Sequence, residues 1–251
     1  MHIEYYSHIS QSLDRKMEFK VYGHAGISFI VFPAQDGRFY DYENFRMVDA
    51  MSWYIENGLV QLFCVDSCDR ESWSLIGQDE SSRIAVQEAY FHYICDELYP
   101  FAKKIHNDLA QADDFECYTT GCSMGATHAL NFFLRRPDLF KGTIALSGIY
   151  HATYFFPNYH DSRIYDNSIT DYLANMPLDH PYLDLYRQSK IVICAGRGRW
   201  EDEVLVDTEI IKEDFKHLNV PAWIDFWGSD VDHDWPWWRK QVIYFLQFFV
   251  R

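Results

Sequence analysis

The sequence predicts an α/β fold, a doubly wound and mostly parallel sheet with helices on both faces. Short, nearly continuous apolar runs recur along the chain, as in strands buried on both faces. Runs with helical spacing separate them and are long enough to form right-handed crossovers between parallel strands. The chain has 251 residues, 48% hydrophobic and 24% charged, which is enough for a sizeable core. We therefore expect a single domain over residues 1–251.

The first half of the chain alternates strands and helices. Residues 17–23 alternate polar and apolar and predict a half-exposed edge strand. Residues 27–32 and 60–65 are almost continuously apolar and predict strands buried on both faces. Helical spacing over 44–56 predicts a helix between these two strands, and the amphipathic run 81–106 predicts a longer helix after them.

The second half continues this alternation and contains one long interruption. Strands are expected at 115–120, 142–146, 191–195 and 221–227, and helices at 126–136, 207–218 and 235–250. Residues 149–188 carry seven tyrosines and are too long for a plain connection between two strands. We interpret this segment as a lid or cap insertion over the functional site, and a tyrosine-rich surface excursion without function is the alternative.

The turn between the strand at 115–120 and the helix at 126–136 is the most informative segment. It reads Gly121-Cys122-Ser123-Met124-Gly125, a G-x-S-x-G pattern. A serine at the apex of a sharp strand-to-helix turn is the nucleophile elbow of α/β-hydrolases, and the glycines make room for so tight a bend. The pattern predicts the α/β-hydrolase fold, with Ser123 as the nucleophile.

A serine hydroxyl needs a base to take its proton and an acid to orient that base. In α/β-hydrolases the order along the chain is serine, acid, histidine. His233 lies directly after the last predicted strand and is the candidate base. The acid should follow the strand at 191–195, where Asp202 is the first candidate and Glu201 the second. Asp207 lies inside the next predicted helix, where we expect a solvated carboxylate.

Acyl transfer also requires hydrogen-bond donors for the developing oxyanion. One donor is the backbone N–H of the residue after the nucleophile, here Met124, at a helix N-terminus that favours negative charge. The second comes from the loop after an early strand, where Gln35 or Asp36 would supply the N–H. Cys122 offers an alternative nucleophile, but its position in an elbow predicts a side chain that faces into the fold.

Composition and missing motifs exclude several classes of function. A net charge of -15 argues against a nucleic acid or an anionic membrane as partner. No C-x-x-C pair, H-x-x-x-H spacing or strand followed by G-x-G-x-x-G is present, so we expect no metal and no cofactor. The N-terminal residues lack a signal sequence and no apolar stretch approaches 18 residues, which predicts a cytoplasmic protein without a membrane span.

Four motifs carry a resemblance to a known family. Residues 12–22 resemble an S-L-G-R opening into a strand, and residues 121–126 match the elbow form with methionine after the serine. Arg136-Pro137-Asp138-Leu139-Phe140, with Ser147-Gly148 after it, and an H-x-W-x-x-W pattern over 233–238 complete the set. The chain resembles the esterase D-like "putative esterase" family of α/β-hydrolases, which includes S-formylglutathione hydrolases, enterochelin esterases, feruloyl esterase domains and mycolyltransferases.

The resemblance implies Ser123 as nucleophile, His233 as base and an acid at Glu201 or Asp202. The usual glycine-rich oxyanion loop is replaced here by residues 33–37. We therefore predict a serine carboxylic ester hydrolase that acts through a Ser-His-Asp/Glu triad and an acyl-enzyme on a small-molecule ester. An acyltransferase with the same triad, or a non-catalytic binding module of the same fold, is the alternative. The sequence makes no prediction of oligomeric state.

Overall fold

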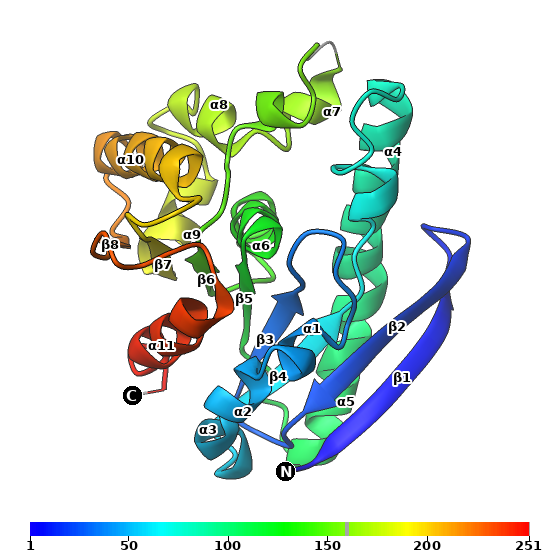
Figure 1. Ribbon diagram of the computed structural model, residues 1–251. Helices are drawn as coiled ribbons and strands as arrows, with labels where there is room; N and C mark the ends of the chain where they lie inside the picture. The colour runs from blue at the N-terminus through cyan, green and yellow to red at the C-terminus, as the bar shows by residue number, and fades with distance from the viewer. Residues whose placement is uncertain (159–160, 251) are drawn as a thin grey trace.

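A computed structural model describes residues 1–158 and 161–250. Its centre is an eight-stranded sheet in the order β1-β2-β4-β3-β5-β6-β7-β8 (Figure 1). β1 pairs antiparallel with β2 and β2 antiparallel with β4, whereas the remaining neighbours pair in parallel. The strands are β1 (Ile3–Ser10), β2 (Arg15–Tyr22), β3 (Ile27–Phe32), β4 (Val60–Val65), β5 (Cys117–Cys122), β6 (Gly142–Leu146), β7 (Lys190–Ala195) and β8 (Trp223–Phe226).

Helices connect the strands and cover the sheet. The α-helices are α1 (Asp41–Asn44), α2 (Met47–Ala50), α3 (Ser52–Glu56), α4 (Glu80–His92), α5 (Tyr99–Ala110), α6 (Met124–Arg135), α7 (Ser162–Tyr165), α8 (Ile169–Ala174), α9 (Tyr182–Gln188), α10 (Asp202–His217) and α11 (Trp235–Leu246). Short 3-10 turns lie at η1 (Asp69–Glu71) and η3 (Ala152–Tyr154), and a π-helical stretch, η2 (Tyr93–Leu98), joins α4 to α5.

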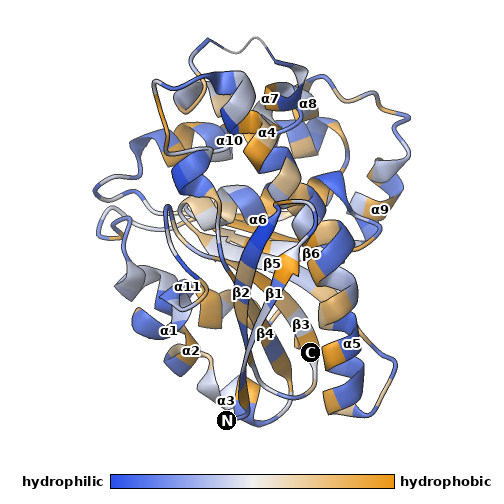
Figure 2. Cartoon of the chain, turned by 90° about the vertical axis from the view of Figure 1, so that its right-hand side faces the viewer, coloured by the Kyte–Doolittle hydropathy of each residue, from blue (hydrophilic) through white to orange (hydrophobic). Residues whose placement is uncertain are grey.

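The two faces of the sheet carry separate apolar cores. In β3, Ile30 and Phe32 pack with residues from α4, α5, α6, α8, α9 and α10, whereas Phe29 and Val31 pack with residues from α1–α3 and α11. All four side chains are buried, as expected for a strand covered on both faces. In Figure 2 the strands at the centre of the sheet are mostly hydrophobic, and the outer helices are of mixed hydropathy. The predicted α/β-hydrolase architecture is confirmed.

Three local predictions were wrong. The edge strand expected over 17–23 corresponds to β2. It is not at the edge of the sheet, because β1, which was not predicted, pairs with β2 along its whole length. The helix expected over 44–56 is divided into α1, α2 and α3, and Arg46 between the first two has a left-handed φ of 61° that no continuous helix allows. α10 begins at Asp202, five residues before the predicted 207.

The expected insertion, residues 149–188, contains η3, α7, α8 and α9. Its helix α8 packs against α10 and its helix α7 against α4, so the segment joins two distant parts of the chain (Figure 1). Tyr154 and Phe155 from this segment line the cavity in which Ser123 lies. The segment therefore forms part of that wall, and its function as a lid stays a prediction.

Candidate active site

Ser123 lies at the bend between β5 and α6 in a strained conformation. Its φ is 57° and its ψ is −128°, a region that costs a non-glycine residue about 1–3 kcal/mol. A Cβ at Gly121 would lie 2.3 Å from the backbone of Gly125, and a Cβ at Gly125 would lie 2.4 Å from the carbonyl oxygen of Phe32. Both glycines are therefore required by the space available, which explains the G-x-S-x-G spacing.

A chain of polar contacts runs from Ser123 through His233 to a buried carboxylate. The distance from His233 Nε2 to Ser123 Oγ is 2.9 Å. His233 Nδ1 lies 3.1 Å from Oε1 of Glu201, which is fully buried. The second oxygen of Glu201 accepts a hydrogen bond from the backbone N–H of Gly196 at 3.2 Å. The bend, the histidine loop and the segment after β7 are thus in direct contact.

The structure places Glu201, and not Asp202, in contact with His233. Asp202, the first candidate, is exposed as the first residue of α10, whereas Glu201, the second candidate, immediately precedes the helix and turns inward. The earlier start of α10 causes this difference. A helix that begins at residue 202 leaves Asp202 exposed and Glu201 buried, and among the carboxylates of the described residues only Glu201 forms a hydrogen bond with His233.

Two glycines bring the loops that carry Glu201 and His233 together. A Cβ at Gly196 would lie 2.2 Å from the carbonyl oxygen of Val231, and one at Gly198 would lie 2.6 Å from the same atom. The N–H of Gly198 donates to that carbonyl at 2.9 Å, and the N–H of His233 donates to the carbonyl of Arg199 at 3.0 Å. Residues 196–199 and 231–233 therefore form a short backbone ladder that fixes the imidazole against Glu201.

Trp238 supports His233 from the first turns of α11. Its ring packs edge-on against the imidazole, with centroids 4.9 Å apart and planes at 85°. Its indole N–H donates to Ser147 Oγ at 3.1 Å. Trp238 is buried, so it ties the imidazole to the loop after β6. This contact gives a structural reason for a tryptophan five residues after the histidine.

The predicted oxyanion donors lie beside Ser123. Gln35 and Met124 line the same cavity, whose volume is about 210 Å³. Met124 is the first residue of α6, so its N–H has no partner inside the helix. Asp36, the alternative to Gln35, donates its N–H to Asp69 at 3.3 Å. The N–H of Gln35 meets no acceptor in the described part of the chain. Of Gln35 and Asp36, Gln35 is therefore the residue whose N–H is available to a substrate oxygen.

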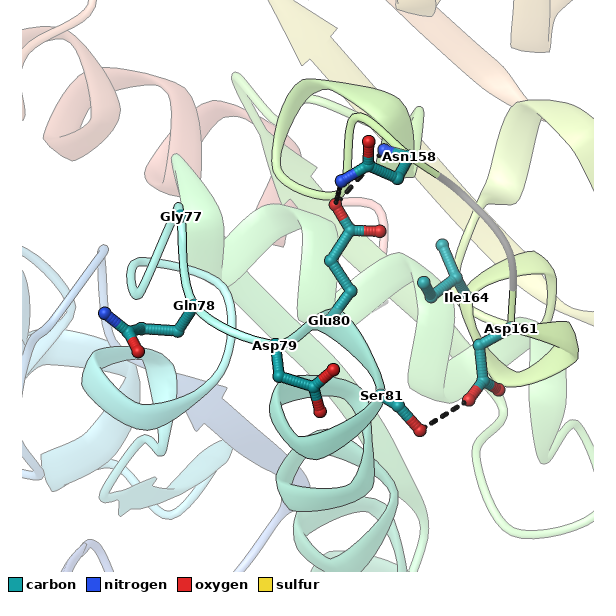
Figure 3. Close-up of a pocket in the computed structure, with 8 residues that line it drawn as sticks. All are labelled: Gly77, Gln78, Asp79, Glu80, Ser81, Asn158, Asp161 and Ile164. Atoms are coloured by element: carbon teal, nitrogen blue, oxygen red, sulfur yellow. Dashed lines mark hydrogen bonds between the residues drawn. The ribbon is translucent and has the colours of Figure 1, made fainter.

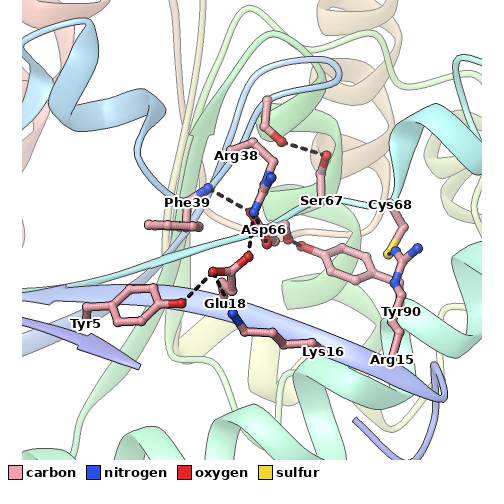
Figure 4. A network of polar contacts seen from close by, with 11 residues as sticks. Tyr5, Arg15, Lys16, Glu18, Arg38, Phe39, Asp66, Ser67, Cys68 and Tyr90 are labelled. Atoms are coloured by element: carbon pink, nitrogen blue, oxygen red, sulfur yellow. Dashed lines mark hydrogen bonds and ion pairs between the residues drawn. The ribbon is translucent and has the colours of Figure 1, made fainter. Parts of the chain in front are cut away.

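A network of charges anchors the far end of the Gln35 loop (Figure 4). The Arg38 guanidinium donates to Asp66 at 2.6 Å and to Glu18 at 2.7 Å, and the Ser67 hydroxyl donates to the carbonyl of Gly37 at 3.0 Å. The hydrogen bond to Asp66 is the main cause of a raised Arg38 pKa. The network ties the loop to β2 and to the segment after β4. Its members are scattered over 50 residues, and no local pattern in the sequence identified it.

A buried hydrogen bond between a carboxylate and an imidazole holds the same loop from its other side. Asp69 and His128 are each about 1% exposed, and Asp69 Oδ1 lies 2.8 Å from His128 Nε2. The other oxygen of Asp69 accepts the N–H of Asp36. The carboxylate thus links α6, which begins at the elbow, to the residue after Gln35. Sequence reasoning missed this pair, because a histidine within an apolar helix gives no signal of its partner 59 residues away.

Asp207 was expected to be solvated, and this was wrong. Its side chain is 1% exposed and accepts the backbone N–H groups of Tyr150 and His151 at 2.5 and 3.0 Å. The imidazole of His151 lies 2.7 Å from the same carboxylate, and this hydrogen bond is the main cause of a raised His151 pKa. Asp207 therefore fastens the start of the 149–188 segment to α10.

Cys122 faces away from the cavity, as expected of the residue before the elbow serine. Its sulfur is fully buried 3.7 Å from the hydroxyl of Tyr42, and burial raises the pKa of the thiol to about 12. A thiol with that pKa supplies almost no thiolate near neutral pH. The geometry therefore favours Ser123 over Cys122 as the nucleophile.

Another cavity, of about 550 Å³, lies between the start of α4 and the insertion (Figure 3). Asp79, Glu80 and Asp161 contribute to its wall, and Ser123 does not. Within residues 1–158 and 161–250, no group of three or more histidine, cysteine or carboxylate side chains is arranged to hold a metal ion. No helix in that part of the chain combines the length and the apolar character needed to cross a membrane.

Comparison with known proteins identifies the family and the fold. The model of a family described as "Putative esterase" matches residues 10–249. An S-formylglutathione hydrolase from Agrobacterium tumefaciens superimposes with a TM-score of 0.76 at 15% identity, over 98% of this chain and 93% of that one. A ferulic acid esterase superimposes with a TM-score of 0.74 at 14% identity, over 100% and 97% of the two chains.

A third structure is the fluorophosphonate-binding serine hydrolase FphF of Staphylococcus aureus. It has a TM-score of 0.68 at 14% identity and aligns over 100% of this chain and 98% of its own. A comparison with curated protein sequences finds no match. Identities this low support the fold, while the family match spans nearly the whole chain. The chain therefore belongs to the Putative esterase family, whose members share the α/β-hydrolase fold.

Proposed function

We propose that this protein is a serine carboxylic ester hydrolase that acts through an acyl-enzyme. The observation that carries the proposal is the contact chain from Ser123 Oγ to His233 Nε2 at 2.9 Å and from His233 Nδ1 to Glu201 at 3.1 Å. Family membership supports ester hydrolysis as the general activity. The contact chain supports the finer assignment of nucleophile, base and acid.

In the proposed mechanism, Ser123 Oγ attacks the carbonyl carbon of the ester while His233 Nε2 takes its proton. Glu201, fully buried and paired with Nδ1, keeps the imidazole in the tautomer that accepts this proton and stabilises the imidazolium that forms. His233 then gives the proton to the leaving alcohol oxygen as its bond to the carbonyl carbon breaks. Water, deprotonated by the same imidazole, hydrolyses the acyl-enzyme and restores the Ser123 hydroxyl.

The N–H groups of Met124 and Gln35 are the proposed donors to the oxyanion. Each such donor is worth about 10²–10³ in kcat when it is already oriented. The positions of both residues on the cavity wall support this role. The network around Arg38 and the Asp69–His128 pair would keep the Gln35 loop in place without movement during the reaction. Residues 149–188 are the proposed cap, because Tyr154 and Phe155 close one side of the cavity.

The test combines a fluorophosphonate probe with a short 4-nitrophenyl ester. We expect the probe to label Ser123 and the ester to be hydrolysed, and we expect Ser123→Ala to lose both reactions while its circular dichroism spectrum stays unchanged. A folded protein without labelling would favour a non-catalytic binding module. Labelling with rapid transfer to an added alcohol, and little hydrolysis, would favour an acyltransferase. The cytoplasmic location stays a prediction.

A further inference from the structure

The described part of the Ser123 cavity wall carries a carboxylate and no arginine or lysine. The wall includes Tyr154, Trp200, Glu203 and His233 beside Ser123, and among the described residues Glu203 is its one carboxylate. A wall of this kind repels an anionic substrate and attracts a cationic one. The net charge of the chain, -15, acts in the same direction over longer distances.

In the described part of the chain Glu203 forms no ion pair, and its charge contributes to the raised pKa of His151. Arg199 lies 3.3 Å from Asp232, and the His151 imidazole lies 2.7 Å from Asp207. Across the described residues the Glu203 carboxylate itself has no ion-pair partner. It shares the first turn of α10 with Asp202, and the partial charge of a helix N-terminus, about +0.5, offsets only part of two carboxylates.

Trp200, on the wall of the same cavity, is unusual in both its exposure and its backbone conformation. The residue is 81% exposed and has a left-handed φ of 67°. Large aromatic side chains are usually buried, and a bulky residue seldom adopts this φ. Tyr154, 50% exposed, supplies another accessible ring to the cavity wall. Exposed aromatic rings beside an unpaired carboxylate are the elements with which proteins bind organic cations.

These groups share the cavity with the imidazole that serves the leaving group. Trp200 directly follows Arg199, whose carbonyl accepts the backbone N–H of His233 at 3.0 Å. The imidazole must lie next to the alcohol oxygen, because it protonates that oxygen when the ester bond breaks. The acyl oxygen points instead toward Met124 and Gln35. Trp200 and Glu203 line the same cavity as His233, within reach of the alcohol part of a bound ester.

We propose that the preferred substrates are esters of a cationic alcohol, such as a quaternary ammonium alcohol, whose positive group is bound by the Trp200 ring and the Glu203 carboxylate. This inference rests on the proposed function. In the reaction, the bond from Ser123 Oγ to the acyl carbon forms and the bond to the alcohol oxygen breaks. The cationic alcohol leaves with the proton that His233 took from Ser123. Water then releases the acid, so no oxidant or further reactant is required.

The experiment compares acetylcholine with 3,3-dimethylbutyl acetate, in which a carbon atom replaces the charged nitrogen. Hydrolysis of both esters is followed by titration of the released acid at constant pH. We expect kcat/KM to be about tenfold higher for acetylcholine, which corresponds to about 1.4 kcal/mol. Glu203→Gln and Trp200→Leu should each reduce this ratio at least threefold, because each removes one of the two groups that bind the positive charge.

Glu213→Gln is the matched control, since it removes the same charge from an exposed position farther along α10. Its ratio should equal that of the unmodified protein, so an equal loss in Glu213→Gln would assign the effect to net charge and overturn the proposed site. A ratio near one, with the neutral ester hydrolysed and Ser123 labelled by fluorophosphonate, would overturn the inference and leave the esterase proposal intact. Failure of both esters together with absence of labelling would overturn both.

Discussion

Glu201→Gln is the substitution that separates the proposed acid from its neighbour. Glu201 is fully buried and its carboxylate lies 3.1 Å from His233 Nδ1. Two opposite charges whose centres are about 4 Å apart attract each other by about 4 kcal/mol at an effective dielectric constant of about 20. Glutamine has nearly the same shape and removes this attraction for the imidazolium formed during the reaction. Loss of about 4 kcal/mol corresponds to a decrease of about 10³ in kcat/KM.

The assay is steady-state hydrolysis of 4-nitrophenyl acetate by the unmodified protein, Glu201→Gln and Asp202→Asn. Asp202 is exposed and has no contact with His233, so its variant should retain activity within about threefold. Thermal melting of each variant controls for loss of the folded state. If Asp202→Asn lost as much activity as Glu201→Gln, or if Glu201→Gln retained more than about a tenth of it, the assignment of the acid would be refuted.

Three further perturbations test the supports of the site. Asp69→Asn should lower kcat about tenfold with a smaller change in KM, because the side chain that accepts the N–H of Asp36 loses its charge. An unchanged kcat would show that Asp69 does not position the Gln35 loop. His151 has a raised pKa, so its bond to Asp207 stabilises the fold fully below about pH 6.5 and is lost as the pH rises through that raised value. His151→Gln should therefore flatten the fall in melting temperature as the pH rises above about 6.5, and an unaltered profile would contradict this linkage. Gly125→Ala should prevent folding or abolish activity, since the new Cβ would lie 2.4 Å from a carbonyl oxygen; a fully active variant would show that the elbow can relax.

The fold and the centre of the candidate site could be predicted from local patterns. The buried strands produce continuous apolar runs, and the elbow needs two glycines around a serine at one spacing, so β5, Ser123 and α6 were recognisable. His233 was recognisable because its order after the last strand is a property of the topology. These features depend on local patterns and on the order of the strands along the chain.

The choice of acid and the supports of the loops depend on residues that are distant in sequence. Glu201 and Asp202 are adjacent carboxylates, and the position at which α10 begins decides which of them turns inward. Asp69 and Asp207 resemble any polar residue of a loop or a helix until their partners are known. β1 was missed because its residues alternate between exposed and half-buried positions at the sheet edge and produce only a weak apolar pattern.

The central claim is that Ser123 carries the acyl group during turnover, and mass spectrometry of the protein during hydrolysis of 4-nitrophenyl acetate tests it most directly. With rapid acid quenching, we predict a mass increase of one acetyl group on the peptide that contains Ser123, and no such increase in Ser123→Ala. Turnover without any acetylated peptide, or with the acetyl group on another residue, would contradict the account.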